Sequence, residues 1–350
     1  MAASTHSLGA LHRPEADGKD RRTGPEGVIS TYDPTMSLNP IILCPGQGAQ
    51  AVGMGKAWFD ASPEARAVFE AADKQLGSRL GAPLSRLCFE GPADALNKTD
   101  VSQPAIYTTS VACWKGLLAS RGMHTNDPSL AATAGLSLGE YTALHIAGAM
   151  TFEDGLELVT LRGRAMQDAA EASQGGMVAL IGATDAQAEE VCQKAKDGEV
   201  LVCANFNAPG QVVLSGHKTA CERAAKVAEG MSLKSAMLPV AGAFYSFLMA
   251  VVATRLEQAL AKARIQPPRC TVVSNVTALP HEVSPTTGPD TIRRRLAEQL
   301  TSPVRWAQGC QWLVASVKGE YMELAPGRTL MGLMRRIDKS VKVTMYDTPQ

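Results

Sequence analysis

The sequence predicts an α/β protein in which a large domain with a parallel sheet core is interrupted by a small inserted domain. Two observations support this fold class. Short apolar runs alternate with longer stretches whose apolar residues recur three and four positions apart, which is typical of strands alternating with helices. Within residues 175–241, the predicted order changes to β-α-β-β-α-β, a split βαβ arrangement.

The first half of the chain carries the first strands and helices of the large domain. Buried strands are expected at 40–44 ("PIILC") and 130–137 ("LAATAGLS"), because both runs are short and consist of apolar or small residues. The Pro-Gly-Gln-Gly run after the first strand indicates a loop. Helical patterns cover 64–76, 103–122, 138–150 and 151–172.

The small domain and the second half of the large domain follow. In the small domain, strands are expected at 176–182, 200–206, 210–216 and 234–240, with helices at 184–198 and 218–230. This order predicts a ferredoxin-like domain. The large domain then resumes with helices at 249–263, 291–300, 309–319 and 330–337 and strands at 270–278 and 321–326.

These patterns divide the chain into three parts. Residues 1–37 are polar, rich in Gly and Pro, and lack hydrophobic periodicity, which predicts a disordered tail. Residues 38–174 and 242–350 are expected to form the large domain. Residues 175–241 are expected to form the small domain inserted into it.

Charge excludes one class of partner. Lys and Arg together number 34, as do Asp and Glu, and the basic residues are not gathered into runs with interleaved aromatics. A nucleic-acid partner is therefore not expected. No apolar run approaches the roughly 18 to 20 residues of a membrane span, so no membrane association is expected either.

Cysteine usage and the tail bear on compartment and metal content. The eight cysteines are scattered singly, without a C-x-x-C pair or a companion His-x-x-x-His, so we expect neither a metal site nor a disulfide framework. Scattered core cysteines suit a reducing compartment. Acidic residues in the tail, such as Glu15 and Asp17, argue against an organelle import signal, so a cytoplasmic protein is expected.

The stretch "GLSLG" at 135–139 suggests a nucleophile. The pattern G-x-S-x-G alone recurs by chance, but here a predicted strand precedes it and a predicted helix follows. In that context the turn presents the Ser137 hydroxyl at the sheet edge, as in α/β-hydrolase-like folds. The loop "CPGQG" after the first strand is suited to supply a second donor to the developing oxyanion, with Gln47 at its tip.

Seven motifs occur together in one order over about 310 residues: "PGQGAQAVGMG", "GPADALNKTDVSQPAIYTTSVA", "GLSLGEYTAL", "LRGRAMQ", "NFNAPGQVVLSGHK", "GAFYSFLM" and "APGRTLMGLMRRI". Together they resemble the malonyl-CoA:acyl carrier protein transacylases and, more distantly, the acyltransferase domains of polyketide and fatty acid synthases. The resemblance covers all but the N-terminal tail.

The resemblance implies a role for five residues. Ser137 takes the malonyl group as an ester, and the backbone N–H groups of Gln47 and Leu138 form the oxyanion hole. Arg162 holds the free carboxylate of malonate, a role suited to a planar guanidinium that can pair both oxygens. Gln299, in "RRRLAEQLTSPVRW", is expected beside the catalytic base.

Two positions depart from the family pattern. Leu136 stands before the nucleophile where histidine is common, which bears on substrate preference. Tyr245 occupies the position of the family's catalytic histidine. A histidine ordinarily titrates near about pH 6.5 and a phenol near about pH 10, so a tyrosine is expected to be a poor general base and to impair activity. Because tyrosine is larger than histidine, the sequence does not decide whether Tyr245 forms a hydrogen bond with Ser137.

None of the other histidines is nominated as a replacement base by its place in the sequence. His145 lies about two helical turns after the nucleophile, and His281 follows a strand in a loop. Each is expected to be a surface or packing residue.

The implied activity is a ping-pong transfer of malonyl from malonyl-CoA to the phosphopantetheine thiol of an acyl carrier protein, in fatty acid or polyketide synthesis. No cofactor is implied, and a monomer is expected. Two alternatives stay open: a serine esterase or thioesterase, and a catalytically weak homologue that binds carrier protein. The sequence leaves malonyl or branched malonyl open, although Phe244 resembles malonyl-selective members.

Overall fold

The computed structural model describes residues 39–123, 129–172, 174–240 and 242–350. The tail predicted for residues 1–37 lies outside the described residues, as does His124. The described residues form one compact unit.

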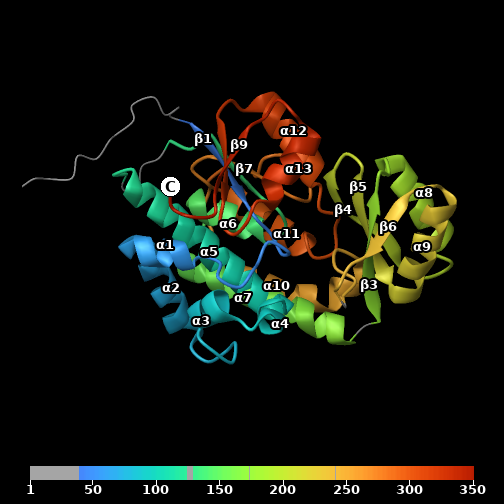
Figure 1. Ribbon diagram of the computed structural model, residues 1–350, viewed down its shortest axis with the longest axis horizontal. Helices are drawn as coiled ribbons and strands as arrows, with labels where there is room; N and C mark the ends of the chain where they lie inside the picture. Colours follow the sequence, from blue (N-terminus) through green and yellow to red (C-terminus); the bar gives the residue numbers. More distant parts are fainter. Residues whose placement is uncertain (1–38, 124–128, 173, 241) are drawn as a thin grey trace, which may run out of the picture. The chain divides into compact units, whose positions relative to one another are not determined.

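A five-stranded sheet forms the centre of the large domain (Figure 1). Its order is β7 (Thr271–Val273), β2 (Ala132–Gly135), β1 (Pro40–Cys44), β8 (Glu320–Leu324) and β9 (Val343–Tyr346). Every neighbouring pair is parallel. Strands β1 and β2 are buried almost throughout, as expected for parallel strands covered on both faces.

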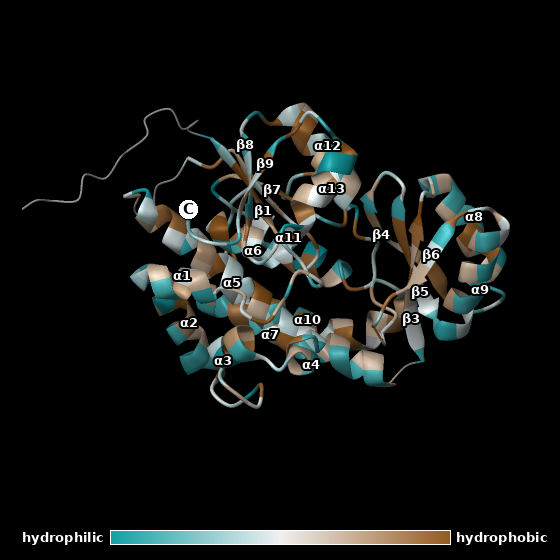
Figure 2. Ribbon diagram, in the orientation of Figure 1, coloured by the Kyte–Doolittle hydropathy of each residue, from teal (hydrophilic) through white to brown (hydrophobic). Residues whose placement is uncertain are grey.

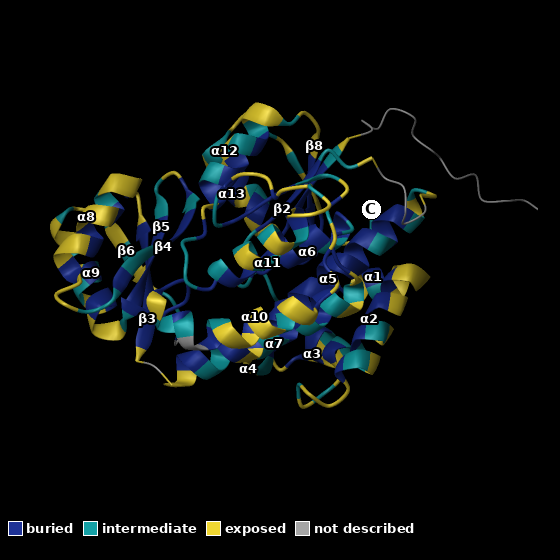
Figure 3. Cartoon of the chain, turned by 180° about the vertical axis from the view of Figure 1, so that it is seen from behind, coloured by how far each residue is buried: buried dark blue, intermediate teal, exposed yellow. Residues whose placement is uncertain are grey.

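The helices of the large domain are α1 (Lys56–Ala61), α2 (Pro63–Leu76), α3 (Leu84–Glu90), α4 (Ala93–Leu96), α5 (Thr99–Ser120), α6 (Gly139–Ile146), α7 (Phe152–Ala172), η1 (Phe247–Met249), α10 (Ala250–Lys262), α11 (Gly288–Glu298), α12 (Trp306–Ser316) and α13 (Thr329–Ile337). Helix α5 is buried along most of its length because α2, α6 and α7 all pack against it (Figure 3). This fixes α7, which carries Arg162, next to the turn between β2 and α6.

The inserted segment forms a second, antiparallel sheet of order β4-β5-β3-β6. Its elements are β3 (Gly175–Ile181), α8 (Asp185–Ala195), β4 (Leu201–Ala208), β5 (Gln211–His217), α9 (Lys218–Gly230) and β6 (Lys234–Met237). Residues such as Val178, Leu180 and Leu214 pack with apolar residues of α8 and α9 into a separate core. Both helices are correspondingly two-faced (Figure 2). The predicted fold class is confirmed, and the domain boundaries stay a prediction.

Strand β4 of the second sheet pairs with a loop of the large domain. The Phe206 N–H donates to the Val304 carbonyl at 2.9 Å, and the Val304 N–H donates to the Ala204 carbonyl at 2.8 Å. Backbone pairing therefore anchors β4 to the segment between α11 and α12.

The expected strand at 270–278 is wrong in length. Strand β7 ends at Val273 because Ser274 opens a turn, in which the Ala278 N–H donates to the Ser274 carbonyl at 2.9 Å and the Ser274 N–H donates to the Leu279 carbonyl at 3.0 Å. The sequence also missed α1, α3, α4, η1 and β9. Each has only three to seven residues, too few for periodicity to stand out.

Glu323 provides a test of stability against pH. It lies fully buried on β8, and its carboxylate accepts from the backbone N–H groups of Leu330 and Met331 at the start of α13, each at 2.7 Å. Burial raises the pKa of Glu323 from its ordinary value of 4.5 to about 7. The folded state therefore binds a proton that the unfolded state releases between these values.

We expect wild type to lose stability relative to Glu323→Gln as pH rises from about 4 to 8. The expected loss is on the order of 3 kcal/mol, and it is measured by urea unfolding across that range. A difference between the two proteins that stays constant with pH would contradict this assignment.

Candidate active site

Ser137 occupies a sharp turn between β2 and α6. Its φ of 55° lies in the left-handed region, which is strained for a residue other than glycine. The flanking glycines make the turn possible. A Cβ on Gly135 would lie 1.9 Å from the backbone of Gly139, and one on Gly139 would lie 2.2 Å from the Cys44 carbonyl oxygen. The two glycines of G-x-S-x-G are therefore required by close backbone approach.

The Pro-Gly-Gln-Gly loop lies against this turn. The Leu136 N–H donates to the Cys44 carbonyl at 3.1 Å, and a Cβ on Gly46 would lie 2.3 Å from the Leu136 carbonyl oxygen. Among the described residues, neither the Gln47 N–H nor the Leu138 N–H donates to another backbone group. Two backbone donors near the nucleophile are thus not used by secondary structure.

Arg162 extends from α7 to Ser137. Only 1% of its surface is exposed, and one terminal nitrogen, Nη2, donates to the Ser137 hydroxyl oxygen at 3.1 Å. The same nitrogen donates to Gln299 Oε1 at 2.9 Å, and Nη1 donates to Gln103 Oε1 at 2.7 Å. Its guanidinium also lies over the ring of Tyr141, 5.7 Å from the centroid. Three hydrogen-bond acceptors and one aromatic ring therefore hold the guanidinium in place.

The Tyr245 phenol reaches Ser137, a contact that the sequence left undecided. Its hydroxyl shares a hydrogen bond with the Ser137 hydroxyl. Tyr245 also has a positive φ of 59°, so its backbone is strained as well. Because the phenol and Arg162 both contact the Ser137 hydroxyl, only 5% of the Ser137 surface is exposed.

Gln299 follows the last residue of α11 and is fully buried. Its Nε2 donates to the Ser137 carbonyl at 3.2 Å and to Glu140 Oε2 at 2.6 Å. The structure thus brings Ser137, Arg162, Tyr245 and Gln299 into one hydrogen-bonded cluster. The Gln47 loop and Leu138 adjoin it.

Sequence reasoning missed two further members of the cluster. Asn275 Oδ1 accepts from the Ser137 N–H at 2.6 Å, and its Nδ2 donates to the Gly135 carbonyl at 2.8 Å. Asn275 lies just beyond β7, and polar residues at the carboxyl ends of parallel strands are a usable signal. Gln103 lies within the recognised stretch "SQPAIY", but nothing in that stretch indicates its contact with Arg162.

A buried acid–histidine pair, also missed, lies behind the cluster. Glu140 Oε1 accepts from His281 Nε2 at 2.7 Å, and both side chains are at most 1% exposed. Glu140 Oε2 accepts from the Asn275 N–H at 3.0 Å. His281 is therefore a buried partner of the site and not an exposed loop residue.

His145 is a packing residue, as expected. Its Nδ1 pairs with the Met150 carbonyl at 3.1 Å, and its ring packs against Tyr107 and Phe152. Burial lowers the pKa of His145 to about 4. It has no contact with Ser137 that could make it the base.

Other features of the described residues do not form part of this site. No group of three or more His, Cys, Asp or Glu side chains is placed to hold a metal ion within the described ranges. All eight cysteines are free. Among the described helices, none combines the length and apolar composition needed to cross a bilayer.

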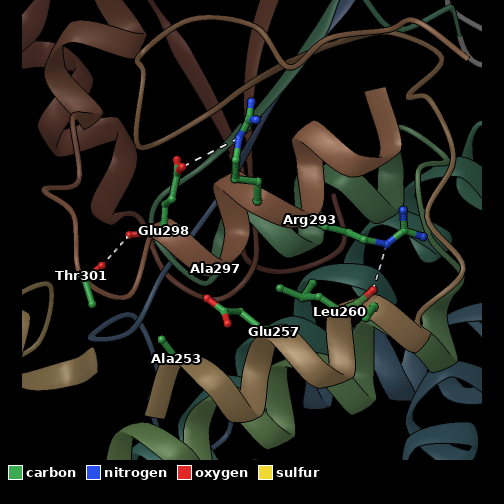
Figure 4. Close-up of a pocket in the computed structure, with 9 residues that line it drawn as sticks. Ala253, Glu257, Leu260, Arg293, Ala297, Glu298 and Thr301 are labelled. Carbon is green, nitrogen blue, oxygen red and sulfur yellow. Dashed lines mark hydrogen bonds and ion pairs between the residues drawn. The ribbon is translucent and has the colours of Figure 1, made fainter. Parts of the chain in front are cut away.

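A pocket of about 470 Å³ lies between α10 and α11 (Figure 4). Leu260 and Ala297 are among its apolar lining residues. Three of its charged lining residues have partners close by: Arg293 donates to the Leu260 carbonyl at 3.0 Å, and Glu298 pairs with Arg294. None of the clustered site residues lines it.

Comparison with known proteins shows one consistent family. The acyl transferase domain model matches residues 41–344. The malonyl CoA-acyl carrier protein transacylase of Salmonella typhimurium is 38% identical over 306 residues, which are 87% of this chain and 94% of the relative. The Bacillus subtilis protein of the same name is 37% identical over 310 residues, covering 88% and 93%.

Solved structures agree. The malonyl-CoA:acyl carrier protein transacylase of Xanthomonas oryzae has a TM-score of 0.81 at 38% identity, covering 90% of this chain and 96% of that one. A malonyl-transacylase in complex with its type II polyketide synthase acyl-carrier protein has a TM-score of 0.80 at 33% identity, covering 89% and 96%.

Proposed function

Since this chain belongs to the acyl transferase domain family, we propose that it transfers a malonyl group from malonyl-CoA to the phosphopantetheine thiol of an acyl carrier protein. The relatives with this activity match nearly their whole length. The observation that carries the proposal is the 3.1 Å contact between the Arg162 guanidinium and the Ser137 hydroxyl. This contact supports the proposal, because a guanidinium is suited to bind a carboxylate and a serine hydroxyl is suited to attack a thioester.

The first half-reaction forms an ester on Ser137. The hydroxyl attacks the thioester carbonyl, the Gln47 and Leu138 N–H groups stabilise the oxyanion, and CoA leaves with the proton from the hydroxyl. Arg162 releases the Ser137 oxygen and pairs with the malonyl carboxylate. In the second half-reaction, the carrier thiol attacks the ester, and its proton returns to Ser137.

Tyr245 is expected to limit the rate of this mechanism, because it has to accept the proton of the Ser137 hydroxyl. Its contact with the Ser137 hydroxyl supports a role in relaying the proton, but a phenol holds its proton far more tightly than an imidazole does near neutral pH. We therefore propose that acylation occurs but is slow. Gln299 orients the turn by donating to the Ser137 carbonyl.

Selection for a dicarboxylic acyl group is proposed to reside in Arg162. Arg162→Ala should lower kcat/KM for malonyl-CoA by about 10- to 100-fold, because a hydrogen-bonded pair with a charged group is lost. Acetyl-CoA has no carboxylate, so its rate should change little. The two rates are compared on both proteins, and an equal loss for both donors would contradict the role.

Transfer itself is tested with radiolabelled malonyl-CoA and holo acyl carrier protein. We expect label on the carrier protein, with a matched carrier that lacks phosphopantetheine as the control. Release of free malonate without carrier would favour the esterase alternative. Binding of carrier protein without transfer would favour the weak homologue.

The proposal also covers where the substrate binds and how the protein works. We propose that malonyl-CoA lies between the large domain (38–174 and 242–350) and the small domain (175–241), where water is excluded from the ester. We also propose that the chain needs no cofactor, works as a monomer and acts in the cytoplasm. The eight free cysteines are consistent with a reducing compartment. Unbranched malonyl is the proposed donor.

A further inference from the structure

Arg162 has no carboxylate partner among the described residues, although it is almost fully buried. It donates instead to the Ser137 hydroxyl and to the oxygen atoms of two amides, Gln103 and Gln299. An amide can be turned end for end at little steric cost, and only one of the two orientations presents oxygen to the guanidinium. Something must therefore set which end of Gln299 faces Arg162.

Glu140 is placed to set that orientation. Its Oε2 accepts from Gln299 Nε2 at 2.6 Å, which turns the NH2 group toward Glu140 and leaves Gln299 Oε1 facing Arg162 at 2.9 Å. The reversed amide would put its oxygen against the carboxylate and its NH2 group against the guanidinium. Both contacts would then be repulsive.

Glu140 is in turn fixed by donors alone. His281 Nε2 donates to Oε1 at 2.7 Å, and the Asn275 N–H donates to Oε2 at 3.0 Å. His281 Nδ1 is buried and has no partner among the described residues, so a proton can sit on Nδ1 in a variant that does not need Nε2 as a donor. A relay runs from His281 through Glu140 and Gln299 to Arg162.

We propose that Glu140 is a positioning residue for malonyl selectivity, which acts by orienting the Gln299 amide toward Arg162, with His281 holding the Glu140 carboxylate. This inference rests on the proposed function, because it presumes that Arg162 recognises the malonyl carboxylate. It assigns Glu140 an effect on the choice of acyl group, beyond any effect on the serine turn.

The two variants Glu140→Met and Glu140→Gln separate orientation from charge. Methionine is similar in length but offers no oxygen, so the NH2 group of Gln299 loses its 2.6 Å partner and keeps only the longer contact with the Ser137 carbonyl, at 3.2 Å. Glutamine removes the charge but keeps an oxygen for Gln299 and Asn275, while its NH2 group can donate to His281 Nε2 once the ring proton moves to Nδ1. Glutamine should therefore preserve selectivity, and methionine should lose it.

Binding is measured in the Ser137→Ala background, so that no chemistry is needed. Isothermal titration calorimetry gives the dissociation constants of malonyl-CoA and acetyl-CoA for each variant, and thermal unfolding confirms that each is folded. We expect the preference for malonyl-CoA to fall about tenfold or more in Glu140→Met and to stay within about threefold in Glu140→Gln. The double variant Glu140→Met/Arg162→Ala should have the same preference as the single variant Arg162→Ala, because both residues act through one interaction.

The proposal is overturned if Glu140→Met weakens both ligands equally, or if Glu140→Gln loses as much preference as Glu140→Met. Should Glu140→Met not fold, Gln299→Leu makes the same test, because the relay requires that removal of the amide lowers the preference. If the Ser137→Ala protein with Glu140 intact shows no preference at all, Arg162 does not select malonyl and the inference fails with it. If the protein transfers no acyl group, the proposed function fails. The binding measurements still decide whether Glu140 affects the preference for malonyl-CoA.

Discussion

Ser137→Ala should reduce malonyl transfer by about 10⁴-fold or more, because removal of a nucleophile eliminates the covalent route and leaves only binding and the oxyanion donors. The expected result is loss of the acyl-enzyme together with loss of transfer. Steady-state transfer to holo carrier protein provides the measurement.

The control is binding of malonyl-CoA, which should persist because Arg162 and its amide partners remain. Ser102→Ala is a matched substitution, since Ser102 is a buried serine on α5 whose hydroxyl, within the described part of the chain, hydrogen-bonds only to the Thr99 carbonyl, at 3.5 Å. It should leave transfer near wild type. Undiminished transfer in Ser137→Ala would show that another residue carries the acyl group.

Tyr245→His should raise the rate of Ser137 acylation by about 10²-fold or more, the contribution of a well-placed general base. The Tyr245 hydroxyl already shares a hydrogen bond with the Ser137 hydroxyl, so a histidine on the same backbone is directed at the nucleophile. The φ of 59° also suits histidine better than a bulky tyrosine. Rapid-quench measurement of the acyl-enzyme burst at pH 7.5 tests this.

Tyr245→Phe is the matched control, because it keeps the ring and removes the hydroxyl. It should not show the gain in rate. If Tyr245→His gains nothing, the base is not the missing component, and the homologue that only binds carrier protein becomes the better description.

The sequence predicted positions whose role depends on residues close to them in the chain. The glycines around Ser137 are required by backbone contacts that recur wherever a strand turns sharply into a helix, so "GLSLG" after a small-residue strand was a usable signal. The loop at Gln47 directly follows the first strand, and this place in the sequence suggested it as the source of a second oxyanion donor. Arg162 and Gln299 came from family motifs and not from physical reasoning on this chain.

What the sequence missed depends on contacts between distant segments. Glu140 and His281 are separated by 141 residues, and neither has a neighbour in the sequence that indicates a buried pair. Asn275 was assigned to the middle of a strand, because the turn that ends β7 at Val273 is closed by hydrogen bonds invisible to periodicity. The reach of the Tyr245 phenol likewise depends on a positive φ that no residue pattern announced.

Mass spectrometry of the protein after incubation with malonyl-CoA, followed by peptide mapping, tests the central claim most directly. We expect one malonyl group per chain, carried as an ester on Ser137 and removed when holo carrier protein is added. A malonyl group on a different residue, or no adduct in either the wild-type protein or Tyr245→His, would contradict it.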